Sequence, residues 1–389
     1  MNARRIGLAL VAALAVAVTV MTVRISGQGA KTPLLVVTAF GGQPHPYTVP
    51  KTPWGDPDLQ GVWSTDDTDR IPMSRPSQFG DRLYLNDEEF AARVKQTERG
   101  VQQAENEATS TFRFDFGRRA FRQASLIVDP PNGQLPAYTA EGRTRPMPRG
   151  TYGNGPLNWT TDFSLYERCI TRGIMGSTLR VIYGNGNRIV QAPGMVVLSY
   201  EMLHDTRVFY TDGRPHIGDK IREYLGDSRA RWEGDELVVE TTNLTDQTAI
   251  GVNGNGNRHS TQMKLTERFK RVANDLLQYQ VTIDDPVTYE RPFTMSFPMT
   301  PLDGGVLLPY DCHEGNMALL QSLGAERAED RRLEEDRAKG IIRERRPVQD
   351  GLGVGGAPAG PGGGLGGGRG RGGAPAGPPP TPGATDQER

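Results

Sequence analysis

Features that identify familiar classes of protein are scarce in this 389-residue sequence. Acidic and basic residues are interspersed and nearly balance, with a formal net charge of −1, so no basic surface for nucleic acid is expected. The chain also lacks a Gly-x-Ser-x-Gly nucleophile motif, a nucleotide-binding glycine loop and a His-Glu-x-x-His zinc motif. We therefore expect no nucleic-acid partner, and no motif indicates a cofactor.

Cysteine is limited to Cys169 and Cys312, and neither belongs to a Cys-x-x-Cys pair. This spacing argues against a zinc knuckle and against a thioredoxin-like redox site. In an exported protein a single structural disulfide is expected. Closing a loop of about 140 residues would stabilise the fold by roughly 4–5 kcal/mol. Two buried free thiols are the alternative.

Long apolar runs are confined to the N-terminus. Arg4 and Arg5 precede an apolar stretch over residues 6–23, and small residues follow up to residue 30. This layout is typical of an export signal. The stretch is slightly long for a signal core, so an uncleaved membrane anchor over residues 1–30 is the alternative. We expect a periplasmic or secreted protein that meets the membrane only through this segment.

Composition then divides the rest of the chain. Asn86, followed by three acidic residues, predicts a capped helix start. Asn316 precedes an apolar run in the same way.

The expected organisation is a linker or arm (31–53), an N-terminal part with a helix and a long irregular excursion packed on the core (54–178), an antiparallel β core (179–315), a C-terminal helix (316–346) and a disordered Gly/Pro/Ala-rich tail (347–389).

Strand patterns dominate residues 179–315. The clearest hairpin runs from Arg229 to Thr242, with its turn at Gly234-Asp235, and a second turn falls at residues 273–275. The predicted fold is mainly all-β, an antiparallel meander that closes into a lipocalin-like barrel or a sandwich, with a few peripheral helices. The Gly-x-Trp ending at Trp63 also occurs in lipocalin-like barrels, where the tryptophan plugs one end.

Residues 196–210 alternate as a single strand with one buried face. This alternation places Tyr200 and His204 on the apolar face, whereas Asp205 and Arg207 point away. A histidine in this position can serve as a general base oriented by an acid. The alternative is an interior histidine whose ring is satisfied by a hydrogen bond.

Seven short motifs occur in an order that resembles an uncharacterised family of secreted bacterial proteins frequent in soil organisms. The resemblance covers roughly residues 53–330 and implies no activity, because none is established for that family. The motifs are Asp58–Trp63, Glu167–Gly173, His204–Arg207, Asp212–His216, Gly226–Arg229, Trp232–Asp235 with the Leu-Val-Val that follows, and Cys312–Asn316.

Three further polar residues are candidates for chemistry. His216 follows Gly-Arg-Pro in a turn, where it can bind a ligand or be a plain turn residue. His313 and Glu314 follow Cys312, and a disulfide there would hold them rigidly beside the core. A His–Glu pair suits acid–base work or half a metal site. Adjacent strand residues point to opposite faces, however, so both rarely serve one centre.

Glu267 alternates with Leu265 and Phe269, so its carboxylate is expected to face the interior. A buried carboxylate is costly unless it is paired. A structural ion pair is one interpretation, and catalysis by a carboxyl with a raised pKa is the other. The predicted arginine partners are Arg229, Arg231 or Arg291.

Three functional hypotheses follow. The first is a barrel that binds a small or sugar-like ligand in a cavity lined by Tyr200, His204, Tyr279 and Phe293, with Tyr200, Arg207, His216, Arg231 and Glu267 as binding residues. The second is a hydrolase or lyase with His204, His313 and Glu314 as acid–base groups and with Arg207 or Arg231 on an anionic substrate group. The third is an envelope scaffold protein. His204, His216 and His313 are suitable metal ligands, but their spacing does not require a metal.

Overall fold

The computed structural model describes residues 46–106, 117–145, 157–251, 256–302 and 304–345. The predicted export segment (1–30), the tail (347–389) and most of the predicted arm (31–53) lie outside the described residues. Among the described residues, no helix has the length and apolar character needed to cross a membrane.

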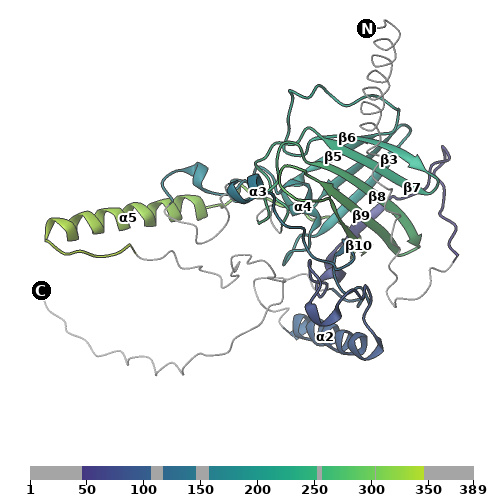
Figure 1. Cartoon of the computed structure of the whole chain (residues 1–389), viewed down its shortest axis with the longest axis horizontal. Helices are drawn as coiled ribbons and strands as arrows, with labels where there is room; N and C mark the ends of the chain where they lie inside the picture. Colours follow the sequence, from purple (N-terminus) through teal and green to yellow (C-terminus); the bar gives the residue numbers. More distant parts are fainter. Residues whose placement is uncertain (1–45, 107–116, 146–156, 252–255, 303, 346–389) are drawn as a thin grey trace, which may run out of the picture. The chain divides into compact units, whose positions relative to one another are not determined.

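Nine strands close into a barrel (Figure 1). Their order around the ring is β1 (Gly61–Ser64), β3 (Gly186–Ala192), β4 (Met195–Tyr200), β5 (Thr206–Tyr210), β6 (Asp227–Glu233), β7 (Glu236–Thr242), β8 (Lys264–Ala273), β9 (Leu276–Asp284) and β10 (Phe293–Pro301). Pairing of β1 with the end of β10 closes the ring, and the short β2 (Ile127–Asp129) pairs with the start of β10. The predicted mainly-β barrel is confirmed.

One strand pair departs from the expected antiparallel meander. β5 and β6 are parallel and meet at Tyr210 and Arg229. The chain between them, residues 211–226, crosses back along the barrel instead of forming a tight hairpin. The barrel is therefore mixed.

The two predicted tight hairpins are confirmed. Gly234 and Asp235 connect β6 to β7, and Gly234 has a φ of 64°, the left-handed conformation that such turns require. Residues 274–275 connect β8 to β9, where Ala273 pairs with Leu276. The β6–β7 register is regular up to its turn, whereas the β8–β9 register shifts between Arg271 and Ala273, just before the turn.

The stretch 196–210 is two strands, not the single strand predicted. β4 ends at Tyr200, and a 3₁₀ turn at Met202–His204 reverses the chain so that β5 pairs antiparallel with β4. Within this turn, Leu203 and His204 have φ values of 59° and 55°. The reversal breaks the period-two alternation, so Arg207 is buried and His204 is exposed. The predicted orientations of these two residues were wrong for this reason.

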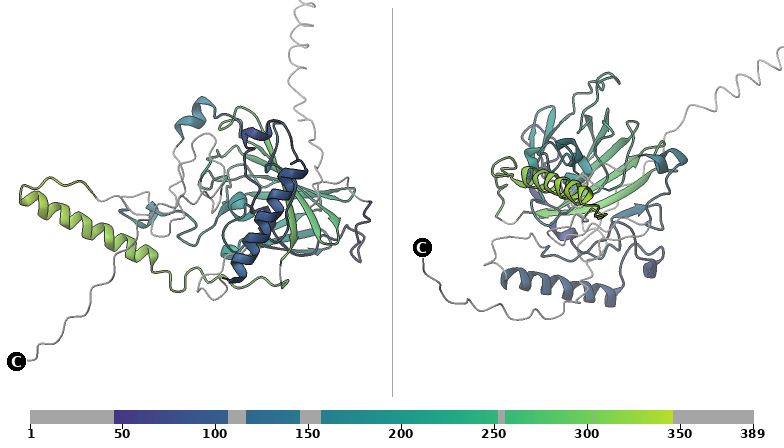
Figure 2. Two further views of the ribbon diagram at one scale, coloured as in Figure 1. Left: turned by 90° about the horizontal axis from the view of Figure 1, so that it is seen from below. Right: turned by 90° about the vertical axis from the view of Figure 1, so that its left-hand side faces the viewer.

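Helices are few. Helix α2 (Asp87–Asn106) lies to one side of the barrel in the right-hand view of Figure 2. Its predicted cap is confirmed: the Asn86 side chain accepts from the Glu89 N–H, and the Glu89 carboxylate accepts from the Asn86 N–H, both at 2.9 Å. The other helical elements are α3 (Ala140–Thr144), α4 (Gly173–Thr178), α5 (Ala318–Ala338) and the 3₁₀ turns Asp66–Thr68, Ser77–Phe79 and Thr160–Asp162.

Side chains fill the barrel interior. The Tyr279 ring lies 4.9 Å from the Phe269 ring and 5.6 Å from the Phe297 ring, measured between centroids. Trp63 is 2% exposed, and the guanidinium of Arg271 lies 5.5 Å from its ring. Three of the four residues predicted to line a ligand cavity are buried in this core, and the fourth, His204, is exposed. Those three residues are Tyr200, Tyr279 and Phe293.

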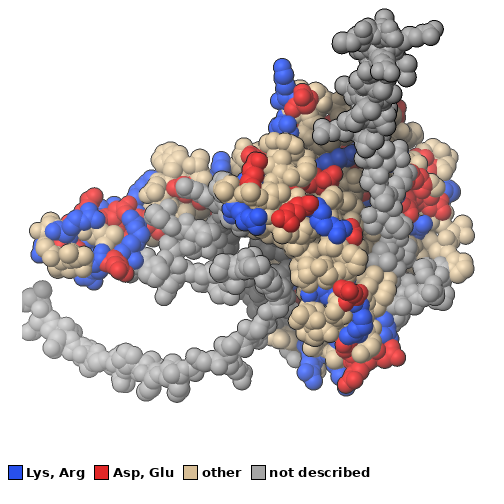
Figure 3. Space-filling model, viewed as in Figure 1, with Lys and Arg blue, Asp and Glu red and all other residues tan. Residues whose placement is uncertain are grey.

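Charged side chains of both signs are interspersed on the face shown in Figure 3. On the outer wall, Arg231 forms ion pairs with Glu233 and Glu240, both at 2.9 Å. The Arg231 side chain is 47% exposed. Exposed pairs of this kind contribute about 0–1 kcal/mol each.

Candidate functional site

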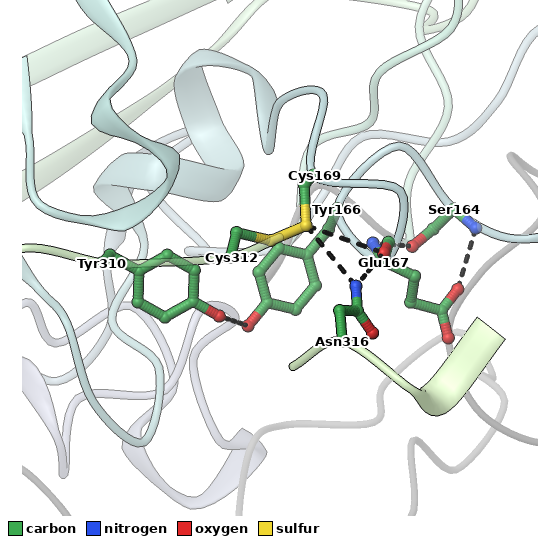
Figure 4. Close-up of a disulfide and its surroundings, with 7 residues drawn as sticks. All are labelled: Ser164, Tyr166, Glu167, Cys169, Tyr310, Cys312 and Asn316. Carbon is green, nitrogen blue, oxygen red and sulfur yellow. Dashed lines mark hydrogen bonds between the residues drawn. A yellow bond between two sulfur atoms is a disulfide. The ribbon is translucent and has the colours of Figure 1, made fainter. Parts of the chain in front are cut away.

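The two cysteines form a disulfide, as predicted, with their Cα atoms 5.8 Å apart (Figure 4). Two hydrogen bonds flank it. The Asn316 side-chain amide donates to the Glu167 carbonyl at 3.2 Å, and the hydroxyls of Tyr166 and Tyr310 lie 3.2 Å apart. The cross-link therefore holds the segment 310–316 against the segment 164–169.

Two residues of these motifs have structural roles visible in Figure 4. The Glu167 carboxylate accepts from the Ser164 N–H at 2.8 Å, and the Glu167 N–H donates to the Ser164 hydroxyl at 3.1 Å. The Asn316 side chain contacts Glu167 and the Cys169 sulfur, so it does not cap α5. The helix begins after Met317, and the predicted Asn316 cap was wrong because the disulfide region recruits this amide.

Arg172, three residues after Cys169, is the most unusual side chain at this site. It is 1% exposed, yet its Nε, Nη1 and Nη2 atoms are buried without a hydrogen-bond partner in the part of the chain that the structure describes. Burial lowers the pKa of Arg172 to about 10, so the guanidinium remains charged at neutral pH. A buried charge without a partner costs several kcal/mol.

Tight packing fixes the backbone beside Arg172. The next residue, Gly173, has a φ of 68°, and a Cβ there would lie 2.8 Å from the Cβ of Thr248. Only glycine satisfies both conditions without displacing a neighbour. The position of Arg172 at the start of α4 is therefore set by a rigid, close-packed turn.

Three tyrosines surround the Arg172 guanidinium. The Tyr166 ring centroid lies 5.7 Å from the guanidinium carbon, and the phenols of Tyr166, Tyr310 and Tyr183 all interact with it electrostatically. Burial raises the pKa of Tyr166 and of Tyr310. These phenols therefore stay neutral and keep their hydroxyl protons.

Asp205 is the acidic neighbour of Arg172. Burial raises the pKa of Asp205, whereas hydrogen bonds from the Thr171 hydroxyl and from the backbone N–H of Arg172 lower it. The Thr171 bond is 2.6 Å long. Asp205 therefore faces Thr171 and the Arg172 backbone rather than pairing with the guanidinium.

The site lies at one end of the barrel. Asn187 at the start of β3 pairs with Tyr200 at the end of β4, so Tyr183 and Asp205 belong to connections at the same end. The segments carrying Tyr166 and Tyr310 are joined there by the disulfide and by the Tyr310 N–H, which donates to His204 Nε2 at 3.1 Å. One cation, one carboxyl group and three phenols are thus brought together.

A second polar cluster lies inside the barrel. Arg207 donates to both Glu267 oxygens, with Nη1 2.8 Å from Oε1, and the two side chains are 2% and 0% exposed. The Tyr279 hydroxyl also donates to Glu267, at 3.0 Å, and Arg207 Nη2 contacts Ser228 and Thr241. Glu267 faces inward as predicted, but its partner is Arg207 and not Arg229, Arg231 or Arg291.

The other predicted site residues do not converge on one centre. His216 Nδ1 lies 2.7 Å from an oxygen of Asp227, and Arg231 is on the outer wall. His313 and Glu314 are exposed in the turn after the disulfide. Within the described ranges, no group of three or more His, Cys, Asp or Glu residues is placed to hold a metal ion.

A surface hollow of about 380 Å³ lies between residues 130–137 and Glu290–Arg291. Its lining is mainly apolar and includes Pro130, Leu135 and Pro136. None of the lining residues is a buried titratable group. We therefore place the candidate site at Arg172 and not in this hollow.

His259 is buried beside Thr248, the residue that packs against Gly173, and burial lowers the pKa of His259. Its Nε2 lies 2.8 Å from the Thr248 hydroxyl, and its Nδ1 lies 3.1 Å from the Ser260 carbonyl oxygen. These contacts satisfy a neutral ring that donates from Nδ1 and accepts at Nε2. The pair has no solvent access, since both side chains are at most 5% exposed.

The lowered pKa of His259 predicts a dependence of stability on pH. A histidine in an unfolded chain has a pKa of about 6.5. Below that pH, His259 therefore binds a proton more readily in the unfolded chain than in the folded protein. The stability that neutral His259 contributes is fully present above the pKa of the unfolded chain. It is lost as pH falls through the lowered pKa of the folded protein. Urea denaturation from about pH 7 to pH 5 should show a declining free energy of unfolding.

The matched variants are His259→Gln and, at an exposed position, His313→Gln. His259→Gln is expected to flatten this part of the pH profile, whereas His313→Gln keeps the wild-type slope. Equal slopes in all three proteins would contradict the assignment to His259.

No family model, curated protein or solved structure matches this chain.

Proposed function

We propose that this chain is an exported β-barrel protein that binds a small anionic ligand through Arg172. The observation that carries the proposal is the charged, buried guanidinium, none of whose nitrogens has a hydrogen-bond partner among the described residues. A guanidinium presents a planar fork of donors that matches the two oxygens of a carboxylate or a phosphate. A bound anion would offset the cost of burying the cation.

Arg207 is an internal comparison for this argument. Its terminal nitrogens donate to Glu267, Ser228 and Thr241, so the barrel supplies partners to a cation that has a structural role. Arg172 is buried to the same degree but receives no such partners. The difference between the two arginines favours a ligand as the partner of Arg172.

Export is supported by two independent features. The N-terminal residues have the charged and apolar pattern of an export signal. The disulfide is of the kind that forms and persists outside the reducing cytoplasm. The ordered motifs that resemble a secreted bacterial family agree with this location.

Acid–base catalysis by His204 has less support. The Nε2 lone pair of His204 accepts the Tyr310 N–H, so it is already engaged. Its ring contacts the Tyr310 backbone rather than His313 or Glu314, and these two residues are exposed. We therefore favour ligand binding over a hydrolase, a lyase or a scaffold.

The proposal is tested by thermal shift and titration calorimetry on protein purified from the periplasm. The probes are benzoate and inorganic phosphate, with benzamide as the neutral counterpart of benzoate. At least one anion is expected to stabilise the wild type, and Arg172→Gln should remove that effect while Arg231→Gln on the outer wall retains it. Anion binding that survives in Arg172→Gln, or no response to either anion, would overturn the proposal.

A second expected result concerns stability without ligand. Arg172→Met should raise the free energy of unfolding of the ligand-free protein by about 1–3 kcal/mol, because it removes a buried charge that has no hydrogen-bond partner among the described residues. Urea denaturation in an anion-poor buffer measures this change. A loss of stability instead would mean that Arg172 is needed for the fold.

A further inference from the structure

We propose that the segment 304–311, here called the strap, is the gate through which an anion reaches Arg172. This inference rests on the proposed function and adds how the site opens and closes. Arg172 is 1% exposed, so an anion in solution reaches its nitrogens only after a neighbouring part of the chain moves. A loop that lifts on its own hinge is a common means of opening a closed site.

The strap lies against the barrel end that carries Arg172. It follows β10 and leads into the disulfide at Cys312, so it is attached at both ends. Tyr310, near the end of the strap, interacts electrostatically with the Arg172 guanidinium. The Tyr310 hydroxyl lies 3.2 Å from that of Tyr166 (Figure 4). Lifting the strap therefore removes one of the three phenols that surround the cation.

The packing of the strap is loose. None of its residues is buried, and Val306 and Leu308 are 59% and 65% exposed. The strap contains neither a strand nor a helix, and the backbone hydrogen bond that Gly305 donates is local, to the Leu302 carbonyl. Segments with few buried apolar contacts and few hydrogen bonds to the rest of the fold open at a low cost in free energy.

Two contacts that can be removed singly fasten the strap to the barrel end. The Tyr310 N–H donates to His204 Nε2 at 3.1 Å. Leu307 is half-buried and packs on Gly186 at the start of β3, since a Cβ at Gly186 would meet the Leu307 side chain. These contacts keep the strap in the closed position.

The hinge of the strap is a pair of glycines. Gly304 and Gly305 have φ values of 77° and 63°, and a Cβ at either position would have no heavy atom within 4 Å. Glycine in open space can rotate about its backbone bonds without steric cost. The turn that carries Arg172 is instead fixed by the close packing of Gly173 on Thr248. Opening therefore moves the strap and leaves the cation in place.

Reaction with phenylglyoxal, which modifies accessible guanidinium groups, measures the opening. Full-length protein purified from the periplasm is treated with the reagent, and peptide mass spectrometry follows each arginine separately. Arg172 is expected to react slowly in the wild type. Two other arginines calibrate access in the same sample: Arg231, with a side chain 47% exposed, should react fast, and Arg207, 2% exposed, should stay unmodified.

Two variants release the strap. His204→Asn removes the acceptor of the Tyr310 N–H and keeps a residue type that tolerates a left-handed backbone, whereas Leu307→Ala removes the packing contact. Each should speed the modification of Arg172 about fivefold, the factor that corresponds to a loss of about 1 kcal/mol. Leu308→Ala, an equal truncation of an exposed neighbour on the strap, is the matched control and should react at the wild-type rate.

Adding benzoate or inorganic phosphate to the same reaction separates the two proposals. Protection of Arg172 by an anion supports the anion site, and faster modification in both variants supports the gate. If an anion protects but the variants react like the wild type, the gate is overturned and the anion site stands. If the variants react faster but neither anion protects, the anion site is refuted, and the strap is a cover that opens without a ligand.

Two further results would be decisive. If Arg207 becomes reactive together with Arg172, the whole barrel has opened and the strap is not the gate. If the variants react like the wild type and neither anion protects, both proposals are overturned.

Discussion

Replacing Arg207 by methionine is expected to lower the free energy of unfolding by about 3–5 kcal/mol. The change leaves the Glu267 carboxylate, which is 0% exposed, without its cation in the barrel interior. The Tyr279 and Thr241 hydroxyls remain as donors to Glu267, but neutral donors do not compensate a buried charge. Urea denaturation, with the slope checked against wild type, measures the loss.

Two further variants isolate the cause. Arg231→Met removes an arginine that also pairs with two glutamates, but on the exposed outer wall, and it should cost only about 0–1 kcal/mol. The double variant Arg207→Met/Glu267→Leu removes both buried charges and is expected to be more stable than Arg207→Met alone. An equal loss of stability in Arg207→Met and Arg231→Met would show that the buried Arg207–Glu267 pair matters no more than an exposed ion pair.

The two interior arginines thus have opposite expected effects. Arg207 pairs with Glu267, so its loss leaves a buried carboxylate without its cation. Arg172 has no hydrogen-bond partner among the described residues, so its loss removes the cost of burying a charge. A residue that lowers stability while it is unliganded is typical of a binding site, where function and stability compete. This contrast depends on hydrogen bonds and not on burial, since both side chains are almost fully buried.

Local signals in the sequence were sufficient for the hairpins and for the direction of Glu267. In β8 the alternation from Leu265 to Phe269 is regular, so the inward direction of Glu267 follows from it, and the register shifts only later, between Arg271 and Ala273. The partner of Glu267 could not be found in this way. Arg207 lies 60 residues away, and the contact exists only because the barrel closes.

The alternation pattern predicted the wrong orientations where the chain reverses without residues that usually indicate a turn. Leu203 and His204 adopt left-handed conformations, although neither is glycine, asparagine or aspartate, the residues that usually announce such a turn. The reversal exchanges the expected positions of His204 and Arg207. The predicted catalytic histidine became an exposed rim residue, and the arginine predicted to face outward became the core cation.

The candidate site was missed for a different reason. Arg172 lies inside one of the recognised motifs, but nothing in the sequence near it predicts that its side chain is buried. Its neighbours Tyr183, Asp205 and Tyr310 come from distant segments. The one available signal was the cysteine pair: a disulfide between residues 169 and 312 necessarily brings Tyr310 close to the segment that contains Arg172.

Removing the disulfide should have the largest effect on both the fold and the site. In Cys169→Ser/Cys312→Ser the free energy of unfolding is expected to fall by about 4–5 kcal/mol, because the cross-link closes a long loop in the unfolded chain. The sequence separation of the two cysteines is 143 residues. Chemical denaturation of the double variant and of the wild type measures the difference.

The site should weaken together with the fold. Without the cross-link, the contact between the Tyr166 and Tyr310 hydroxyls and the Asn316 contact with Glu167 still join these two segments. The anion affinity should therefore fall at temperatures where the double variant is still folded. Wild type reduced with a dithiol should match the double variant, which itself should not respond to the dithiol. If the loss is below about 1 kcal/mol, or if anion affinity is unchanged, the disulfide does not organise the Arg172 site.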